Sequence, residues 1–282
     1  MKFVAEVSSN HHRDLERSLQ FVDTSARIGC EAVKFQLFKV DSLFSPEVFK
    51  AKPEVAARRD WELPLSFLPD LAARARGHGL QFSATPFYLE AVGELYPHVD
   101  FYKVASYELL WTDLLRECAQ TGKPLVLSTG MATMDEIARA VEVARVNGCT
   151  DLTLLHCTSG YPTPVEQCNL AAIQTLREAF GCKAGWSDHS ANPGVIHRAV
   201  NRWRAEMIEF HLDLDGQGDE FKTGHCWLAD EMAPVIRQVR DAGRADGSGV
   251  KVPVLAEQPD REWRADPTDG LRPLKSKRVL LA

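Results

Sequence analysis

The stretch Leu125-Val126-Leu127-Ser128-Thr129-Gly130 shows the pattern that decides the fold. Its apolar half reads as a short strand buried on both faces, and polar residues follow where that strand ends. Downstream, Met134–Val146 has helical spacing, with Ile137, Val141 and Ala144 on one face. The two segments together predict one strand–helix unit of a parallel sheet.

The same unit recurs along most of the chain. Glycines such as Gly29 and Gly122 stand where a helix would end before the next strand. Strand-helix units in this number predict a closed (β/α)₈ barrel, the TIM barrel, or a large doubly wound sheet. The predicted strands are 3–7, 32–36, 81–85, 101–104, 125–128, 152–156, 184–187 and 207–212.

The length favours the barrel as a single domain. The chain has 282 residues, and such barrels typically have about 250. We expect a catalytic barrel over 1–245 and a C-terminal extension over 246–282 that packs on it. The longest irregular segment, 41–64, contains three prolines, and a loop of this length is more often functional than accidental.

Charge and cysteine content narrow the function classes. The net charge of −6 disfavours nucleic acid as a partner, although a local cluster of cations can still hold a small anion. Seven cysteines without a Cys-x-x-Cys pair argue against a disulfide framework or a zinc ribbon. No signal peptide and no apolar stretch near the roughly 20 residues of a membrane span are evident, so we expect a cytoplasmic protein without a membrane partner.

Polar side chains gather where the predicted strands end. Catalytic groups of a parallel barrel come from the carboxyl ends of its strands. Polar groups inside short apolar strands are costly unless partnered, which favours one shared polar site. The candidates are Glu6, Asn10, Lys34, Gln36, Thr85, Lys103, Ser106, Ser128, Ser159, Ser187, Asp188, His189, Glu209 and His211.

These residue types suggest a chemistry. Lys34 and Lys103, with hydroxyls around them, would form a cradle for phosphate and carboxylate groups. Neutral imidazoles of His189 and His211 would bind a divalent transition metal. Carboxylates at the same face would bind hydroxyls or transfer protons, and these are Glu6, Asp188 and Glu209.

Each signal also has an ordinary explanation. A strand-end lysine is usually a solvated rim residue, and two histidines about twenty positions apart are seldom a metal site. Ser-Thr-Gly after a strand can simply cap the next helix. Only the joint placement of these groups at one face of a barrel makes the functional interpretation strong.

The motifs in order resemble one family. Glu6-Val7-Ser8-Ser9-Asn10-His11 resembles the opening Glu-x-x-x-Asn-His motif of the sialic acid synthase (N-acetylneuraminate synthase) family. The resemblance covers nearly the whole chain in the same order. The other matching strings are Ala32-Val33-Lys34-Phe35-Gln36, Phe82-Ser83-Ala84-Thr85-Pro86-Phe87, Tyr102-Lys103-Val104-Ala105-Ser106, Leu127-Ser128-Thr129-Gly130-Met131, Leu155-His156-Cys157-Thr158-Ser159 with Tyr161-Pro162, Trp186-Ser187-Asp188-His189-Ser190 and Ile208-Glu209-Phe210-His211.

The resemblance implies a homodimeric barrel transferase that condenses phosphoenolpyruvate with an aldose such as N-acetylmannosamine, giving a 2-keto sugar acid and phosphate. It implies a divalent metal, Mn²⁺ or else Mg²⁺ or Co²⁺, on His189 and His211. Glu6 and Glu209 would face the reacting centre, and Tyr161 would line the acceptor site. The donor would be held by Lys34, Thr85, Lys103, Ser106, Ser128 and Ser187, with Asn10, Gln36 and Ser159 as further substrate contacts.

Two departures from the family pattern bear on function. Phe210 replaces the lysine that many relatives have between Glu209 and His211, but it alternates away from both. The antifreeze-like domain that follows the barrel in typical relatives is not recognised, so a separate antifreeze-like protein is an expected partner. Two other functions stay open: a different metal-dependent sugar aldolase or isomerase on the same barrel, and a catalytically silent binding subunit.

Overall fold

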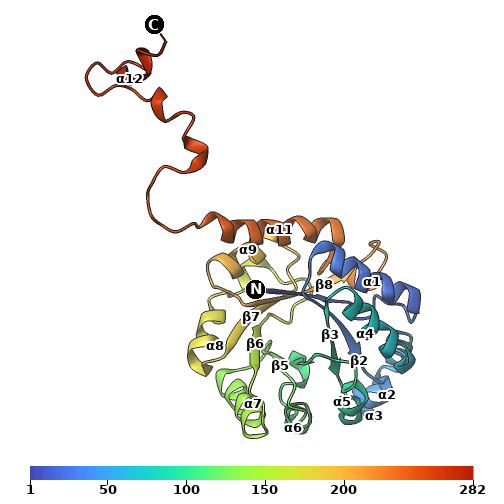
Figure 1. The fold of residues 1–282 in the computed structure, drawn as a ribbon. Coiled ribbons are helices and arrows are strands. Elements are labelled where there is room, and N and C mark those ends of the chain that lie inside the picture. Colours follow the sequence, from blue (N-terminus) through green and yellow to red (C-terminus); the bar gives the residue numbers. More distant parts are fainter. Residues whose placement is uncertain (282) are drawn as a thin grey trace. The chain divides into compact units, whose positions relative to one another are not determined.

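The computed structural model describes residues 1–281 and contains a closed barrel of parallel strands. Strands adjacent in the chain pair with each other, and β1 pairs with β8 to close the sheet, with helices around the outside (Figure 1). The (β/α)₈ barrel predicted from the sequence is therefore confirmed. Its strands are β1 (Lys2–Glu6), β2 (Ala32–Leu37), β3 (Gln81–Pro86), β4 (Phe101–Val104), β5 (Leu125–Ser128), β6 (Leu152–His156), β7 (Lys183–Asp188) and β8 (Met207–Asp213).

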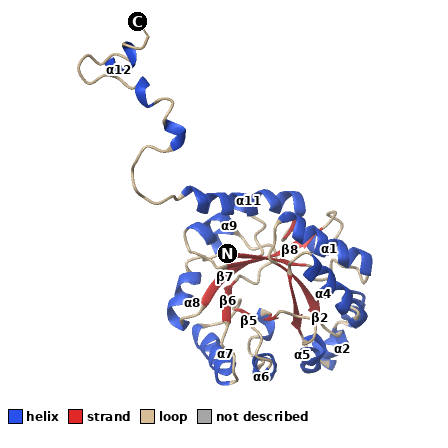
Figure 2. Ribbon diagram, in the orientation of Figure 1, coloured by secondary structure: helices blue, strands red, loops and turns tan. Residues whose placement is uncertain are grey.

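The helices lie between the strands in sequence and outside them in space (Figure 2). Helix α7 (Met134–Val146) has the predicted bounds and begins with a capping box in which Thr133 and Glu136 bond to each other's backbone N–H groups. The other α-helices are α1 (Leu15–Ile28), α2 (Val40–Leu43), α3 (Pro46–Ala51), α4 (Leu68–Gly77), α5 (Leu89–Leu95), α6 (Thr112–Gln120), α8 (Ala172–Phe180), α9 (Pro193–Asn201), α10 (Asp219–Lys222), α11 (Ala229–Ala245) and α12 (Lys275–Arg278).

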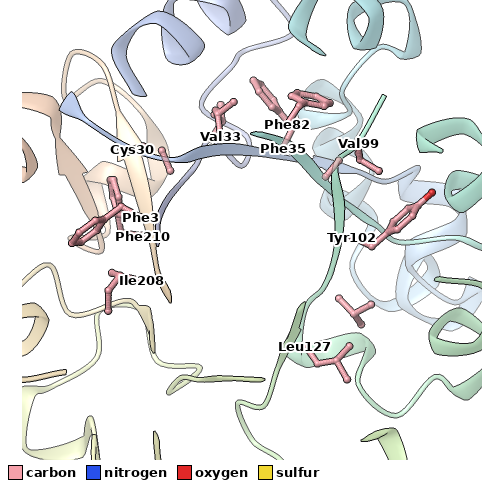
Figure 3. Close-up of a cluster of buried hydrophobic side chains, with 14 of the residues drawn as sticks. Phe3, Cys30, Val33, Phe35, Phe82, Val99, Tyr102, Leu127, Ile208 and Phe210 are labelled. Carbon is pink, nitrogen blue, oxygen red and sulfur yellow. The ribbon is translucent and has the colours of Figure 1, made fainter. Parts of the chain in front are cut away.

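The outer faces of the strands form the main hydrophobic core. Side chains of a strand alternate between two sides, so every second residue of each strand faces the helices. Phe35, Phe82, Tyr102 and Phe210 are all fully buried there, and Figure 3 shows them on the outer side of the strand ring. Burying a large apolar side chain in this way contributes about 1.5–3 kcal/mol, so this layer fixes the positions of the strands.

The inner faces of the same strands change character from one end of the barrel to the other. Near the amino ends of the strands, Val4, Phe101, Val126 and Met207 form part of a small separate apolar cluster. Two residues further along the strands the inward positions are charged or hydroxylated, as at Lys103, which follows Phe101 with one residue between. The apolar cluster therefore lies below the inward-facing lysines, which are near the carboxyl end of the barrel.

The sequence suggested that segment 41–64 is irregular, but the structure has helices there. It contains the short helices α2 and α3 and a 3-10 helix, Pro53–Trp61. The prolines at positions 46 and 53 stand at the first turns of two of these helices, where the missing N–H leaves no internal hydrogen bond unmade. Two of the three prolines therefore mark the beginnings of helices in this segment.

An additional short strand, β9 (Cys226–Leu228), was not predicted. It pairs with β8 in parallel register, with His211 opposite Cys226. The chain between the two strands returns toward the carboxyl end of the barrel. This return brings residues of the β8–β9 connection to the same face as the strand ends.

The chain divides into two compact units after Ala242. The first is the barrel. The second contains short helical turns, among them α12, and is held within itself by contacts such as the hydrogen bond from the backbone N–H of Lys275 to Asp266. The expected packing of 246–282 on the barrel stays a prediction. No helix among residues 1–281 is both long enough and apolar enough to cross a membrane.

Candidate active site

A cavity of about 360 Å³ opens at the carboxyl ends of the strands. Its size suits a small-molecule ligand, for which pockets are typically about 300–1,000 Å³. Most of the residues predicted from the sequence line it. These are Glu6, Lys34, Gln36, Thr85, Lys103, Ser106, Ser128, Tyr161, Ser187, His189, Glu209 and His211.

Two buried lysines and two buried carboxylates form the floor of the cavity. The ammonium of Lys34 contacts the carboxylate of Glu6 and lies 3.8 Å from Oε1 of Glu209. Lys103 Nζ lies 3.2 Å from the same oxygen of Glu209. Burial alone would raise the pKa of Glu209, but the two ammonium groups outweigh it and hold that pKa below its usual range. The positive charges of both lysines are therefore balanced by carboxylates, and both side chains line the cavity.

Three serine hydroxyls lie in or next to the cavity lining, and two of them have no hydrogen-bond partner among the described residues. Ser128 Oγ and Ser159 Oγ are buried and make no hydrogen bond among residues 1–281. Ser106 Oγ accepts a hydrogen bond from the N–H of Gly130 at 3.0 Å. Buried donors that lack a partner lose free energy unless a ligand supplies one. An anionic ligand on Lys103 would supply an acceptor for Ser128.

The absence of a side chain at Gly130 keeps these groups close together. A Cβ at this position would lie only 2.9 Å from Ser106 Oγ and 2.9 Å from Cys157 Sγ, and it would collide with Ser159 Oγ. Ser159 does not line the cavity, and its hydroxyl lies against Gly130. The Ser-Thr-Gly string therefore does more than cap a helix, because its glycine lets the strands β4, β5 and β6 place hydroxyls around one point.

The opposite wall carries three imidazoles. The rings of His189 and His211 lie 5.4 Å apart, and those of His211 and His225 lie 4.9 Å apart, centroid to centroid. Tyr161 packs 4.3 Å from His189. Burial, followed by the neighbouring His211, lowers the pKa of His189 to about 3, so its imidazole is neutral at physiological pH. A neutral imidazole is the form that binds metals.

Sequence reasoning missed His225 and Glu220. Both belong to the β8–β9 connection and not to a strand end, yet both line the cavity. Donor atoms of His211, Glu220, His225 and Cys226 lie within 4.8 Å of one another. A second histidine within fifteen positions of His211 was the signal in the sequence that could have found this site. The donor set of imidazoles and a carboxylate fits a divalent transition metal.

Besides Ser159, two predicted site residues do not line the cavity. Asp188 is fully buried on the outer face of β7, where its carboxylate accepts hydrogen bonds from the indole N–H groups of Trp186 and Trp227, both at 3.0 Å. The prediction that Asp188 acts in catalysis is therefore wrong in its placement, because Asp188 alternates with the inward-facing Ser187 and His189. Asn10 likewise lies outside the cavity lining and donates from Nδ2 to the backbone oxygen of Leu212 at 3.0 Å.

Comparison with known proteins places this geometry in a family. The model of the NeuB family matches residues 21–251. The chain belongs to the NeuB family. It is 35% identical over 259 residues to an uncharacterised protein of Methanocaldococcus jannaschii, covering 90% of this chain and 74% of that protein. It is 32% identical over 270 residues to N,N'-diacetyllegionaminic acid synthase of Campylobacter jejuni, covering 90% and 80% of the two chains.

Solved structures agree with this NeuB assignment. N-acetylneuraminic acid synthetase from Leptospira borgpetersenii, solved with citrate, has a TM-score of 0.78 and 29% identity, over 93% of this chain and 90% of that one. A spore coat polysaccharide biosynthesis protein E from Chromobacterium violaceum has a TM-score of 0.79 and 26% identity, over 93% and 81%. A truncated 3-deoxy-D-arabino-heptulosonate 7-phosphate synthase from Thermotoga maritima, at 16% identity, shows the shared fold alone.

Proposed function

We propose that this NeuB-family chain is a transferase that condenses phosphoenolpyruvate with an aldose of the N-acetylmannosamine type, giving a sialic-acid-type 2-keto sugar acid and phosphate. The family and the names of its relatives support this reaction. The observation that carries it is the cavity itself. Two lysines that are paired with carboxylates lie on its floor, and three imidazoles lie on its wall.

The donor end of the cavity is the lysine floor. Phosphoenolpyruvate carries a phosphate and a carboxylate, and charge-assisted hydrogen bonds from ammonium groups and hydroxyls suit both. We assign the donor to Lys34, Thr85, Lys103, Ser106, Ser128 and Ser187, with Gln36 beside them. Ser128 gains the acceptor that its hydroxyl lacks. Ser159 supports this end from behind the cavity wall, and Asn10 supports the end of β8 through the backbone oxygen of Leu212.

The acceptor end is the imidazole wall. We assign a divalent metal to His189 and His211, as the sequence predicts, together with His225. Mn²⁺ is the ion we propose, and Mg²⁺ and Co²⁺ are the alternatives. A divalent ion at this wall would polarise the carbonyl oxygen of the acceptor aldehyde. We assign the sugar contact to Tyr161, whose ring is partly exposed and packs in a tilted arrangement against that of His189.

The buried carboxylates suit the charges that develop during the condensation. The methylene carbon of phosphoenolpyruvate forms a bond to the aldehyde carbon, and positive charge develops at the enol carbon. Glu209 is ionised and can stabilise that charge. Water then adds to this carbon, the bond from the carbon to the phosphate oxygen breaks, and a ketone remains. Glu6 or Glu209 accepts one proton of this water and passes it to the former aldehyde oxygen, which becomes a hydroxyl, and the second proton leaves with the phosphate.

Partners and location follow from the same resemblance. We propose a cytoplasmic homodimer whose small-molecule substrates enter from the carboxyl face of the barrel. An antifreeze-like protein is a further partner that we propose, and it would complete the acceptor end. The segment 41–64 contributes Arg58 to the cavity lining, so this part of the barrel also takes part in forming the mouth.

The test is phosphate release from phosphoenolpyruvate with Mn²⁺ and a panel of aldoses, including N-acetylmannosamine and its phosphorylated and diacetamido analogues. We expect release that depends on both metal and acceptor. A folded protein that binds Mn²⁺ and sugar but releases no phosphate would instead be a different sugar aldolase or isomerase. A protein that binds phosphoenolpyruvate without turnover of any acceptor would be a silent binding subunit.

A further inference from the structure

We propose that His211, Glu220 and His225 bind the divalent metal directly, beside the His189 assigned above, so that Glu220 adds one carboxylate to the imidazoles. This inference rests on the metal-dependent function proposed above. It adds an anionic ligand that the resemblance does not assign. It is carried by the hydrogen-bond pattern around the three side chains.

The first step is the tautomer of His225. The hydroxyl of Thr223 has one hydrogen, and it donates that hydrogen to the backbone oxygen of Glu220 at 2.7 Å. Nδ1 of His225 lies 2.7 Å from the same hydroxyl oxygen, which must therefore accept. In its neutral form, which is the form that binds a metal, His225 thus carries its proton on Nδ1 and has a lone pair on Nε2.

The second step is what that lone pair faces. Nε2 of His225 lies 3.6 Å from Oε2 of Glu220. A lone pair and a carboxylate oxygen are both acceptors, so this pair repels unless a positive charge lies between them. The charge and softness of the two donors match a divalent cation of the first transition row.

The third step is the spacing of the donors. Nδ1 of His211 lies 2.7 Å from Oε2 of Glu220, the oxygen that lies 3.6 Å from Nε2 of His225. The shorter contact is a hydrogen bond while Nδ1 of His211 carries a proton, and a bound metal ion would displace that proton. Donors about 2.1 Å from one ion lie about 3.0 Å apart at right angles and about 3.4 Å apart in a tetrahedron. The two observed separations bracket these values, so a small movement of the side chains would enclose an ion.

The carboxylate is also held in place. Oε1 of Glu220 accepts hydrogen bonds from the hydroxyls of Ser8 and Ser9, which follow β1. These bonds leave Oε2 as the oxygen available to the metal. Such outer hydrogen bonds orient metal ligands and lower the cost of ordering them.

Cys226 is not part of this ligand set. Its thiol is buried, lies outside the cavity lining and is 3.8 Å from both Glu220 Oε2 and Asn10 Nδ2. The resulting set of nitrogen and oxygen donors favours Mn²⁺, Co²⁺ or Fe²⁺ over ions that require sulfur.

The experiment measures Mn²⁺ binding without substrates, by the electron paramagnetic resonance signal of free Mn²⁺, in the wild type and in Glu220→Ala and Glu220→Gln. Oxygen-17 water then counts the waters on the bound ion. We expect both variants to bind Mn²⁺ at least tenfold more weakly, and the alanine variant to hold one additional water. The matched control is Asp219→Asn on the same short helix, because Asp219 is exposed and paired with Lys222; its Mn²⁺ affinity should not change.

The outcomes separate this inference from the proposed reaction. Unchanged Mn²⁺ affinity in Glu220→Ala, or weaker binding with an unchanged water count, would show that Glu220 only holds the histidines and would overturn the inference. Circular dichroism establishes that each variant is folded, and Glu220→Gln keeps the side-chain volume if the alanine variant does not fold. Phosphate release by the wild type is measured separately, so a chain with the proposed ligand set but no phosphate release would contradict the reaction alone.

Discussion

Replacing Lys103 with methionine tests whether the lysine floor binds the donor. The change keeps the volume of the side chain and removes its charge. Glu209 then keeps only Lys34, whose ammonium is 3.8 Å away instead of the 3.2 Å of Lys103. Breaking a buried ion pair on one side typically costs about 3–5 kcal/mol. Because Lys34 remains, we expect a loss near the lower end, about 3 kcal/mol, in the free energy of unfolding.

The same substitution should weaken donor binding by a separate route. A charge-assisted hydrogen bond to a phosphate contributes about 1.5–3 kcal/mol. Since about 1.4 kcal/mol corresponds to tenfold in affinity, we expect the affinity for phosphoenolpyruvate to fall between about 10-fold and 150-fold. Affinity for Mn²⁺ should stay unchanged, because the imidazoles are not altered.

A double variant separates the two effects. Adding Glu209→Gln to Lys103→Met removes the unpaired carboxylate, so stability should recover by more than half while the affinity for phosphoenolpyruvate stays low. Urea unfolding measures the first quantity, and isothermal titration with phosphoenolpyruvate measures the second. Lys183→Met is the control, because Lys183 is half-exposed in a surface ion pair with Asp151 at the other end of the barrel. Donor affinity of Lys103→Met equal to that of this control would refute the reasoning.

Three further predictions concern buried groups. Burial lowers the pKa of His11 to about 4, so the unfolded chain binds more protons than the folded chain between about pH 6.5 and 4. The free energy of unfolding is therefore highest above pH 6.5 and about 2 kcal/mol lower at pH 5. In urea unfolding, His11→Asn should lose this part of the acid sensitivity, and an unchanged pH profile would contradict the prediction. Burial raises the pKa of Glu108 to about 7, so ionisation of this carboxyl group opposes folding as the pH rises from 4.5 to 7. Glu108→Gln should therefore raise the free energy of unfolding by about 2–3 kcal/mol at pH 8 and leave it unchanged at pH 4. Equal increases at the two pH values would argue against burial as the cause. Asp188→Asn should lose about 1.5–3 kcal/mol of stability, because one of the two indole N–H groups loses its acceptor oxygen. We expect an unchanged kcat in the folded enzyme, and a lowered kcat at full stability would restore a catalytic role.

The local sequence determined where the strands lie and which side chains face the barrel interior. The two-residue period of a strand is a local property, so Lys103 and Glu209 could be placed inside and Phe210 outside without coordinates. The same period, applied strictly, would have placed Asp188 on the outer face. The prediction gave weight to the position of Asp188 at a strand end. It did not consider that Asp188 directly follows the inward-facing Ser187 and must therefore face outward.

Only the tertiary structure decided which groups outside the strands join the site. Glu220 meets Ser8, more than two hundred residues earlier in the chain, because β8 closes on β1 and the β8–β9 connection folds back over that junction. His225 reaches the cavity because β9 adds beside β8. Neither position belongs to a periodic element that points into the barrel, so their contacts depend on closure of the sheet, and a periodic pattern along the sequence does not encode closure.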